Sequence, residues 1–238
     1  MALSGGSVRG LAHIGVVKAL TEVGIQPEII TGTSAGSLIG AALAAGMTWQ
    51  DLADLARSVV WFKLLHGDTL EKFCAERFPE TFKELRLPFA AIATHVPTKK
   101  VVTIKDGHLP SAISASCAMR GVRGAVIREG QRLKDGGIAC VLPSVSCREM
   151  GADFVIGSDV WELSSLLRSV GIHPTHSQRQ RIYPSHYRRA LHHTDMLVTP
   201  AIPHRGYVPG KKAVELMIAA GEQATHQALK RLFIHRAA

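Results

Sequence analysis

The feature that most constrains this chain is the pentapeptide Gly-Thr-Ser-Ala-Gly at residues 32–36, about thirty residues from its start. Residues 28–31 are typical of a short buried strand, and residues 35–45, rich in Ala, Leu and Ile, are typical of a helix. A serine between such elements lies on a sharp turn that exposes its hydroxyl, and the flanking glycines permit that turn. The pattern predicts that Ser34 is either an exposed nucleophile or only the cap of a helix. The predicted nucleophile elbow also contains Gly32, Thr33, Ala35 and Gly36.

A glycine-rich segment, Ser-Gly-Gly-Ser-Val-Arg-Gly at residues 4–10, precedes a helix expected near residues 9–23. Turns of this kind aim several unpaired N–H groups at one point and bind anions. The dinucleotide fingerprint fails because Ser7 replaces its second glycine, and the P-loop fails because Leu11 stands where lysine is required. The remaining interpretation is an oxyanion hole for a tetrahedral acyl intermediate. Its predicted residues are Gly5, Gly6, Ser7, Val8, Arg9 and Gly10.

A third motif, Asp-Gly-Gly at residues 135–137, follows a predicted strand at residues 131–134. Asp-Gly is common in ordinary turns. An ionised carboxylate within hydrogen-bond reach of Ser34 could instead take the proton of its hydroxyl. Aspartate, with an ordinary pKa of about 4, is a weak base for an alcohol. The pair is therefore plausible only beside a strong oxyanion hole, which the glycine-rich segment would supply.

These motifs resemble, in order and spacing, those of the patatin-like phospholipases, above all the small bacterial members related to neuropathy target esterase. The resemblance rests on Ser-Gly-Gly-x-x-Arg-Gly-Leu-Ala-His-x-Gly, Gly-Thr-Ser-Ala-Gly and Asp-Gly-Gly, and it extends over nearly the whole chain. Residues 87–94 are similar to the family's central strand, and residues 112–119 to the helix ahead of the aspartate.

The resemblance implies a Ser–Asp dyad without a catalytic histidine. Ser34 matches the nucleophile and Asp135 the base, which activates first the serine and then water. Gly136 and Gly137 complete the base motif. The expected oxyanion donors are the N–H groups of Gly6, Ser7 and Val8. Arg9 matches the basic residue of the motif, with a structural ion pair and a substrate contact both left open.

The chain departs from the family pattern at four places. Ser7 replaces the third glycine of the loop, which would restrict the backbone if that position needs a positive φ. Arg120 stands where proline is usual, residues 123–125 replace an aromatic and proline-rich segment, and residues 140–141 replace an Asn-Asn-like pair. Because these residues are expected near the site, substrate preference stays open.

The main rival architecture is the α/β-hydrolase, which orders its triad Ser, Asp, His and carries several strands before the elbow. Only one strand–helix unit precedes Ser34 here, which argues against that fold. Histidines do follow Asp135, but none stands in a recognisable catalytic setting. They are His173, His176, His186, His192, His193, His204, His226 and His235.

The order of hydrophobic patterns predicts one patatin-like α/β domain over residues 1–238, with a mainly parallel sheet between two helical layers. A chain of 238 residues that is 46% hydrophobic can bury one large core. The expected strands are 1–5, 28–32, 88–95, 100–104, 126–134, 153–158 and 196–199. The expected helices are 9–23, 35–45, 48–57, 69–77, 110–118, 142–149 and 211–233. The first strand is short, which predicts a weakened edge of the sheet.

The remaining composition predicts a cytoplasmic protein without a metal or organic cofactor. The four cysteines match no zinc spacing and are expected as reduced thiols. No signal peptide is visible, and no apolar run approaches the roughly 20 residues of a membrane span.

The formal charge of +9 is unevenly distributed, because residues 163–194 contain no Asp or Glu. No nucleic-acid-binding motif accompanies this basic segment. It predicts either peripheral contact with an anionic membrane, such as the inner membrane surface, or a solvated loop that aids solubility.

The function predicted from these features is serine hydrolysis of lipid acyl esters, either phospholipids or lysophospholipids, through an acyl-enzyme. Two alternatives stay open: acyl transfer from the same acyl-enzyme, and a membrane-associated regulatory protein with an impaired site near Arg120.

Overall fold

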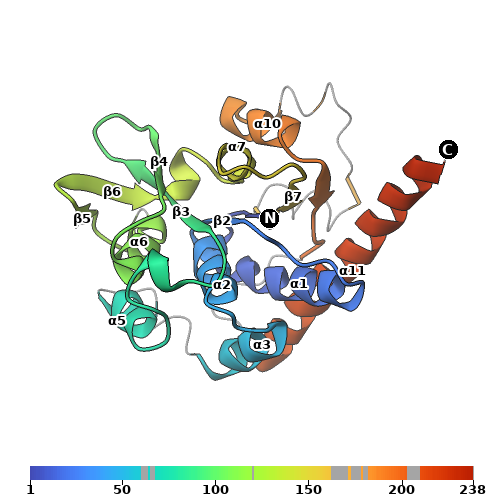
Figure 1. The fold of residues 1–238 in the computed structure, drawn as a ribbon, viewed down its shortest axis with the longest axis horizontal. Helices are drawn as coiled ribbons and strands as arrows, with labels where there is room; N and C mark the ends of the chain where they lie inside the picture. Colours follow the sequence, from blue (N-terminus) through green and yellow to red (C-terminus); the bar gives the residue numbers. More distant parts are fainter. Residues whose placement is uncertain are drawn as a thin grey trace.

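The computed structural model describes residues 1–59, 64, 68–119, 121–161, 171–172, 178, 182–202 and 210–237, with side chains described as far as residue 232. A central sheet lies between helices on both faces (Figure 1), so the predicted α/β class is confirmed. The strands are β1 (Ala2–Leu3), β2 (Ile30–Thr33), β3 (Phe89–His95), β4 (Val101–Ile104), β5 (Val126–Arg128), β6 (Gln131–Asp135), β7 (Ile156–Ser158) and β8 (Met196–Val198).

Hydrogen-bonded pairs connect the strands along the path β5-β6-β3-β2-β1-β7-β8, and β4 pairs with β3 along the edge opposite to β2 and β6. The pairs β3–β2, β2–β1, β1–β7 and β7–β8 are parallel, whereas β4, β5 and β6 are antiparallel to their neighbours. Strand β1 therefore lies inside the sheet, between β2 and β7. The expected weak edge at the first strand is wrong, because parallel neighbours cover β1 on both sides despite its shortness.

The helices form two layers. One face of the sheet carries α1 (Ala12–Glu22), α2 (Ala35–Ala44), α3 (Trp49–Ser58) and α11 (Lys211–Ala237). The opposite face carries α7 (Ser144–Glu149) and α10 (Ser185–His192) (Figure 1). Helix α6 (Leu109–Ser116) packs against α2, and α5 (Thr69–Ala75) packs against α6. Short 3-10 turns occupy Ser7–Leu11, Phe82–Glu84 and Gly136–Ile138.

Two hydrophobic cores correspond to the two faces, and β1 shows how the sequence divides them. Leu3 packs in the larger core with α1, α2 and α11, whereas Ala2 packs in the smaller core with Tyr187 of α10. Adjacent strand residues point to opposite faces, so a strand buried on both sides must be apolar throughout. The helix expected at residues 211–233 is α11, and its residues Val214 and Leu229 are almost fully buried in the larger core.

The region expected as one strand over residues 126–134 is a hairpin of β5 and β6. Glu129 and Gly130 both have positive φ, at 50° and 73°. Two such residues make the tight turn that matches the twist of antiparallel strands. Glu-Gly is a less common turn pair than Asn-Gly, which is why the pattern alone merged the two strands.

Much of the basic segment 163–194 lies outside the described residues, so its contact with an anionic membrane stays a prediction. Its described end is not a solvated loop. Helix α10 buries Tyr187 to 1% exposure, and the hydroxyl of Tyr187 donates to the buried carboxylate of Asp159.

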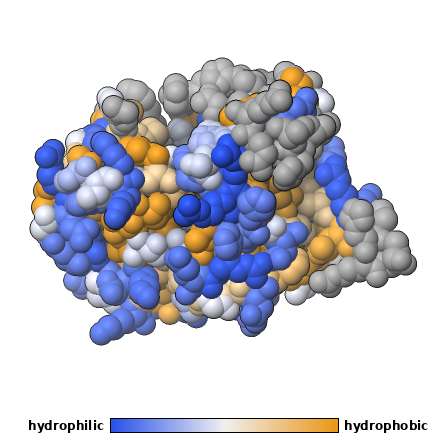
Figure 2. All heavy atoms as spheres, turned by 90° about the horizontal axis from the view of Figure 1, so that it is seen from above, coloured by the Kyte–Doolittle hydropathy of each residue, from blue (hydrophilic) through white to orange (hydrophobic). Residues whose placement is uncertain are grey.

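On the face shown in Figure 2, apolar residues reach the surface between strongly hydrophilic ones.

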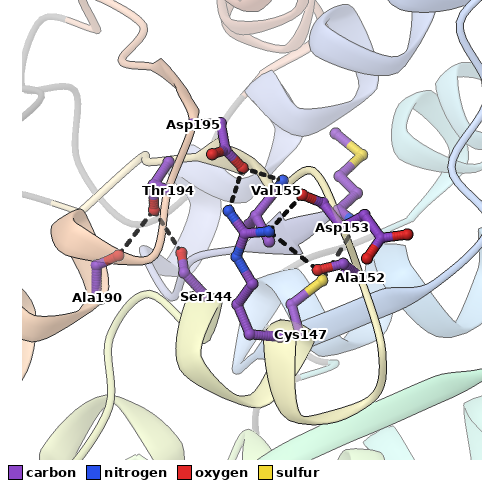
Figure 3. A network of polar contacts seen from close by, with 10 residues as sticks. Ser144, Cys147, Ala152, Asp153, Val155, Ala190, Thr194 and Asp195 are labelled. Atoms are coloured by element: carbon purple, nitrogen blue, oxygen red, sulfur yellow. Dashed lines mark hydrogen bonds and ion pairs between the residues drawn. The ribbon is translucent and has the colours of Figure 1, made fainter.

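A polar network fixes the start of β7 against the start of β8 (Figure 3). Arg148 donates to the carbonyls of Ala152 at 3.0 Å and Asp153 at 2.5 Å, and it forms an ion pair with Asp195. Asp195 also accepts from the backbone N–H of Val155 at 2.6 Å. The network secures β7, whose far end supports the glycine-rich loop.

Among the described residues, no helix combines the length and apolarity that crossing a membrane would require. All four cysteines are free, as the sequence predicts.

Candidate functional site

Strand β3 brings Ser34 and Asp135 together. Its residues 91–94 pair with β4, so β2 and β6 must share the opposite edge. Strand β2 pairs there up to Thr33, opposite Ile92, and β6 ends at Asp135, opposite Ala93. The two strands run toward one another along one edge, so the chain leaves β2 beside the last residue of β6. The register of β3 therefore places the serine next to the aspartate, 101 residues apart.

Ser34 occupies a strained turn between β2 and α2, with φ 51° and ψ −121°. A side chain rarely adopts this conformation, and such strain persists only where surrounding contacts fix it. The N–H of Ser34 donates to Ser116 Oγ at 2.9 Å, and Ser116 in turn donates to the carbonyl of Ile92 at 2.6 Å. The carbonyl of Ser34 accepts from Ser37 through both its N–H and its hydroxyl. These bonds hold the strained backbone that presents the Ser34 hydroxyl.

Ser116 and Ser37 are functional neighbours that sequence reasoning missed. Both lie in apolar, alanine-rich helices, and both are buried to 0% exposure. The hydroxyl of a buried serine needs a hydrogen-bond partner. Serines within the apolar sequences of α2 and α6 were the signal available in the sequence.

The Ser34 hydroxyl donates to Asp135 Oδ2 at 2.7 Å, and the N–H of Gly137 donates to Asp135 Oδ1 at 2.8 Å. Both side chains are nearly closed to solvent, at 6% and 8% exposure. Burial raises the pKa of Asp135, while the hydrogen bonds from Ser34 and Gly137 and the charge of Lys134 oppose that rise. A carboxylate whose pKa is raised is a better proton acceptor than an ordinary aspartate.

Glycine is required in the elbow because the backbone there passes very close to other backbone atoms, and not because the position must be flexible. A Cβ on Gly36 would lie 2.3 Å from the carbonyl oxygen of Leu3, so only glycine lets α2 begin against the end of β1. The N-terminus of α2, with its positive dipole end, consequently faces the Ser34–Asp135 pair. Gly32 lies within β2, Thr33 donates to the carbonyl of Cys140 at 2.9 Å, and Ala35 begins α2.

The base motif also depends on close packing. Gly136 begins a 3-10 turn directly after β6, and a Cβ there would lie 2.1 Å from the carbonyl oxygen of Ile92. The turn aims the N–H of Gly137 back at the carboxylate.

Some backbone N–H groups of the glycine-rich loop have a described hydrogen-bond acceptor, and others have none. Gly5 donates to the carbonyl of Val141 at 3.0 Å, and Arg9 donates to that of Gly6 at 3.1 Å. No described acceptor bonds the N–H groups of Gly6, Ser7 or Val8, which stand at the start of the 3-10 turn. Free N–H groups at a helical start form a site for a negative oxygen. Within the predicted loop, these three amides are the available donors.

Ser7 adopts a positive φ of 53°. The structure therefore accepts serine in place of the third glycine, but at the cost of backbone strain. This is the restriction predicted from the sequence for a position that needs a positive φ.

His13, in helix α1, forms a hydrogen bond to the glycine-rich loop. Its Nε2 lies 3.0 Å from the carbonyl of Ser4 and its Nδ1 lies 2.7 Å from Ser158 Oγ. Because a carbonyl only accepts, Nε2 carries the proton and Nδ1 accepts from the Ser158 hydroxyl. The Ser4 hydroxyl accepts from the N–H of Val160 at 2.8 Å. His13 therefore joins the first residue of the loop to the end of β7.

Burial lowers the pKa of His13 to about 4, against the hydrogen bond to Ser4, from an ordinary 6.5. The unfolded chain takes up a proton below pH 6.5, whereas the folded protein takes it up only near pH 4. Stability is therefore lost as the pH falls from 6.5 to 4, by about 3 kcal/mol in total. We expect urea unfolding to show this loss in the wild type and a smaller loss in His13→Gln. Equal pH dependence in the two proteins would contradict the assignment.

An apolar pocket adjoins Ser34. It is lined by Ser34 and Ser7 together with Val8, Ala35, Leu38, Leu64, Leu70, Cys117 and Met119. Burial, together with the charge of Asp135, raises the pKa of Cys117 to about 12, so its thiol stays protonated and is a poor nucleophile. The pocket suits a hydrophobic group attached to a reacting carbonyl.

The residues that depart from the family pattern make different kinds of contact in the structure. Arg120 is outside the described residues. The Arg123 side chain is 9% exposed and lies 3.7 Å from the carboxylate of Asp68. Cys140 and Val141 supply carbonyls that fix Thr33 and Gly5. The Arg9 guanidinium donates to the carbonyl of Val160 at 3.3 Å, a structural contact for this residue.

Among the described residues, the donors to the Asp135 carboxylate are the Ser34 hydroxyl and the N–H of Gly137, and neither belongs to a histidine. Of the histidines that follow it, His173, His176 and His204 lie outside the described residues, as does the side chain of His235. Burial lowers the pKa of His186.

Glu22, Glu222 and His226 form the one cluster of potential metal ligands among the described residues. The ammonium of Lys18 lies 2.8 Å from both carboxylate oxygens of Glu222. This cation already balances the acidic group, and the cluster joins α1 to α11 rather than serving Ser34.

Comparisons with known proteins show the family and the fold of the chain. The model of the family described as patatin-like phospholipase matches residues 1–143. Patatin-like phospholipase domain-containing protein 6 of Mus musculus is 31% identical over 179 residues, which cover 67% of this chain and 13% of that protein. An uncharacterized NTE family protein of Mycobacterium tuberculosis is 33% identical over 170 residues, covering 66% of this chain and 47% of the relative. The chain thus spans less than half the length of either relative.

The crystal structure of VipD from Legionella pneumophila has the same fold, with a TM-score of 0.66 at 14% identity. The match covers 96% of this chain and 66% of that one. The family model covers more than half of the 238 residues, including the glycine-rich loop, the elbow and the aspartate motif. The chain belongs to the patatin-like phospholipase family.

Proposed function

We propose that this protein is a serine hydrolase that cleaves acyl esters of lipids through an acyl-enzyme on Ser34, with Asp135 as the base. The observation that carries the proposal is the 2.7 Å hydrogen bond from the Ser34 hydroxyl to Asp135 on a strained elbow. Family membership supports lipid esters as the substrate class, and phospholipids or lysophospholipids are the proposed members of that class.

The first half of the reaction forms the acyl-enzyme. Asp135 accepts the hydroxyl proton while Ser34 Oγ bonds to the acyl carbon. The negative oxygen that results is stabilised by the free N–H groups of Gly6, Ser7 and Val8 and by the N-terminus of α2. The C–O bond to the alcohol then breaks, and the departing oxygen takes the proton from Asp135.

The second half releases the acyl group as a carboxylic acid. Asp135 takes a proton from water, whose oxygen bonds to the acyl carbon, and the proton returns to Ser34 Oγ as the ester breaks. The raised pKa of Asp135 favours the two steps in which it accepts a proton, from Ser34 and then from water, because a base of higher pKa is a better proton acceptor. The apolar pocket beside Ser34 would accommodate the acyl chain.

A fluorophosphonate probe tests the proposal, because it bonds covalently to activated serines. We expect the folded wild type to be labelled and Ser34→Ala to be unlabelled. Ser58→Ala, at the exposed end of α3, is the matched control and should label like the wild type. Absence of labelling in the folded wild type would favour the non-catalytic alternative.

Products separate the remaining possibilities. Mass spectrometry of a mixture of phosphatidylcholine and lysophosphatidylcholine would show which ester is cleaved. Addition of an alcohol acceptor would reveal acyl transfer as a new ester in place of free fatty acid.

A further inference from the structure

Ser7 combines two features that are unfavourable for folding. Its φ of 53° places a residue with a Cβ in the left-handed region, where glycine would be unstrained. Its hydroxyl oxygen is closed to solvent and has no hydrogen-bond partner among the described residues. Buried hydroxyls nearly always find a partner, so an unpartnered one calls for a reason other than stability. A glycine at this position would remove both costs.

The position of Ser7 supplies that reason. Ser7 and Ser34 line the same pocket, and they carry the only hydroxyl groups among its described lining residues. Ser7 also begins the 3-10 turn whose first N–H groups have no described acceptor. The unpartnered hydroxyl therefore belongs to a residue that lines the pocket beside Ser34, rather than to one at a remote site.

We propose that the Ser7 hydroxyl is a further catalytic donor, which hydrogen-bonds the acyl oxygen of the substrate as that oxygen becomes negative. This inference rests on the proposed function and adds a side-chain donor to the backbone donors of the loop. A hydroxyl can donate one hydrogen bond and can rotate to meet an oxygen whose position changes during the reaction. Donors that bond only the charged state lower the barrier without tightening substrate binding.

Ser7→Gly is the informative variant because it removes the hydroxyl and relieves the backbone strain together. We expect its stability toward urea to equal or exceed that of the wild type. We expect kcat for a p-nitrophenyl ester to fall about 100-fold, while KM changes little, as for the loss of one oxyanion donor. Ser7→Ala, which keeps the strain and lacks the hydroxyl, should lose kcat to the same extent.

Lys99→Gly is the matched control. Lys99 has a φ of 57° in the exposed turn between β3 and β4, so this change relieves similar strain far from the pocket. It should leave kcat unchanged.

A thionoester substrate gives a readout that a structural role would not move. Sulfur accepts hydrogen bonds more weakly than oxygen does, so the wild type should prefer the ester over its thiono analogue. That preference should shrink in Ser7→Gly and persist in Lys99→Gly.

The outcomes are separable. If the wild type is not labelled by the fluorophosphonate, the proposed function itself fails. If the wild type is labelled but Ser7→Gly keeps the kcat and the thiono preference of the wild type, the role of the hydroxyl is overturned and the dyad stands.

Discussion

We expect Asp135→Asn to reduce the hydrolysis of a lipid ester by about 10²- to 10⁴-fold, the range for the loss of a general base. The amide cannot accept the proton of Ser34 at any pH of interest. We expect the same change to leave the protein at least as stable as the wild type at neutral pH. Burial raises the pKa of Asp135, which means that the ionised carboxylate is less favourable in the folded protein than in the unfolded chain.

The pH dependence follows from the same shift. The folded pKa lies above the unfolded value of 3.8, so the folded protein binds this proton more tightly. As the pH falls through the folded pKa, the contribution of Asp135 to stability rises while activity is lost, because the base becomes protonated. Asp135→Asn should lack that contribution to the pH dependence of stability.

The measurements are kcat/KM for an ester between pH 4.5 and 8, and urea unfolding at both ends of that range. Asp106→Asn, at an exposed carboxylate, is the matched control and should behave as the wild type. Retention of more than a tenth of the activity in Asp135→Asn would mean that another group, such as a histidine, serves as the base.

Gly221→Ala should destabilise the protein by about 3 kcal/mol or more, the upper range for a clash in a packed core. Helices α1 and α11 meet through backbone atoms at two glycines. A Cβ on Gly221 would lie 1.9 Å from the carbonyl oxygen of Ala12, and a Cβ on Gly15 would lie 1.8 Å from that of Ile218. Backbone atoms cannot rotate away, so the two helices would have to separate.

Urea unfolding and thermal melting test this prediction, with an expected decrease in melting temperature of about 10 °C for a chain of this size. Gly124→Ala is the control, because no atom lies within 4 Å of the Cβ it would add. If Gly221→Ala and Gly124→Ala melted together, the close helix contact would be wrong.

Local patterns predicted most elements of the fold. The alternation of strand and helix patterns predicted the α/β class, and it also predicted the long last helix, α11. The patterns failed where a turn or a partner strand decides the structure. The hairpin of β5 and β6 turns on two consecutive residues with positive φ, and the interior place of β1 depends on β2 and β7.

The residues that hold the elbow and the glycine-rich loop in place were harder to predict from the sequence than Ser34 and Asp135. Ser116 holds the elbow although it lies 82 residues from Ser34, and His13 joins Ser4 of the glycine-rich loop to Ser158, which lies 145 residues from His13. A single serine or histidine in a buried helix carries no periodic signal that names its partner. Only the packing of α6 and α1 against the sheet assigns them these contacts.

The sequence by itself determined the chemistry that is available: a serine between two glycines, an aspartate before two glycines, and a loop rich in free N–H groups. These properties are local, because they depend on residue type and on the backbone that a few neighbours allow. The tertiary structure alone decided that the groups meet. Strands β2 and β6 share one edge of β3, and that register sets Ser34 Oγ 2.7 Å from Asp135 Oδ2. Strand pairing between distant segments is a property of the whole sheet, so no short stretch of sequence encodes it.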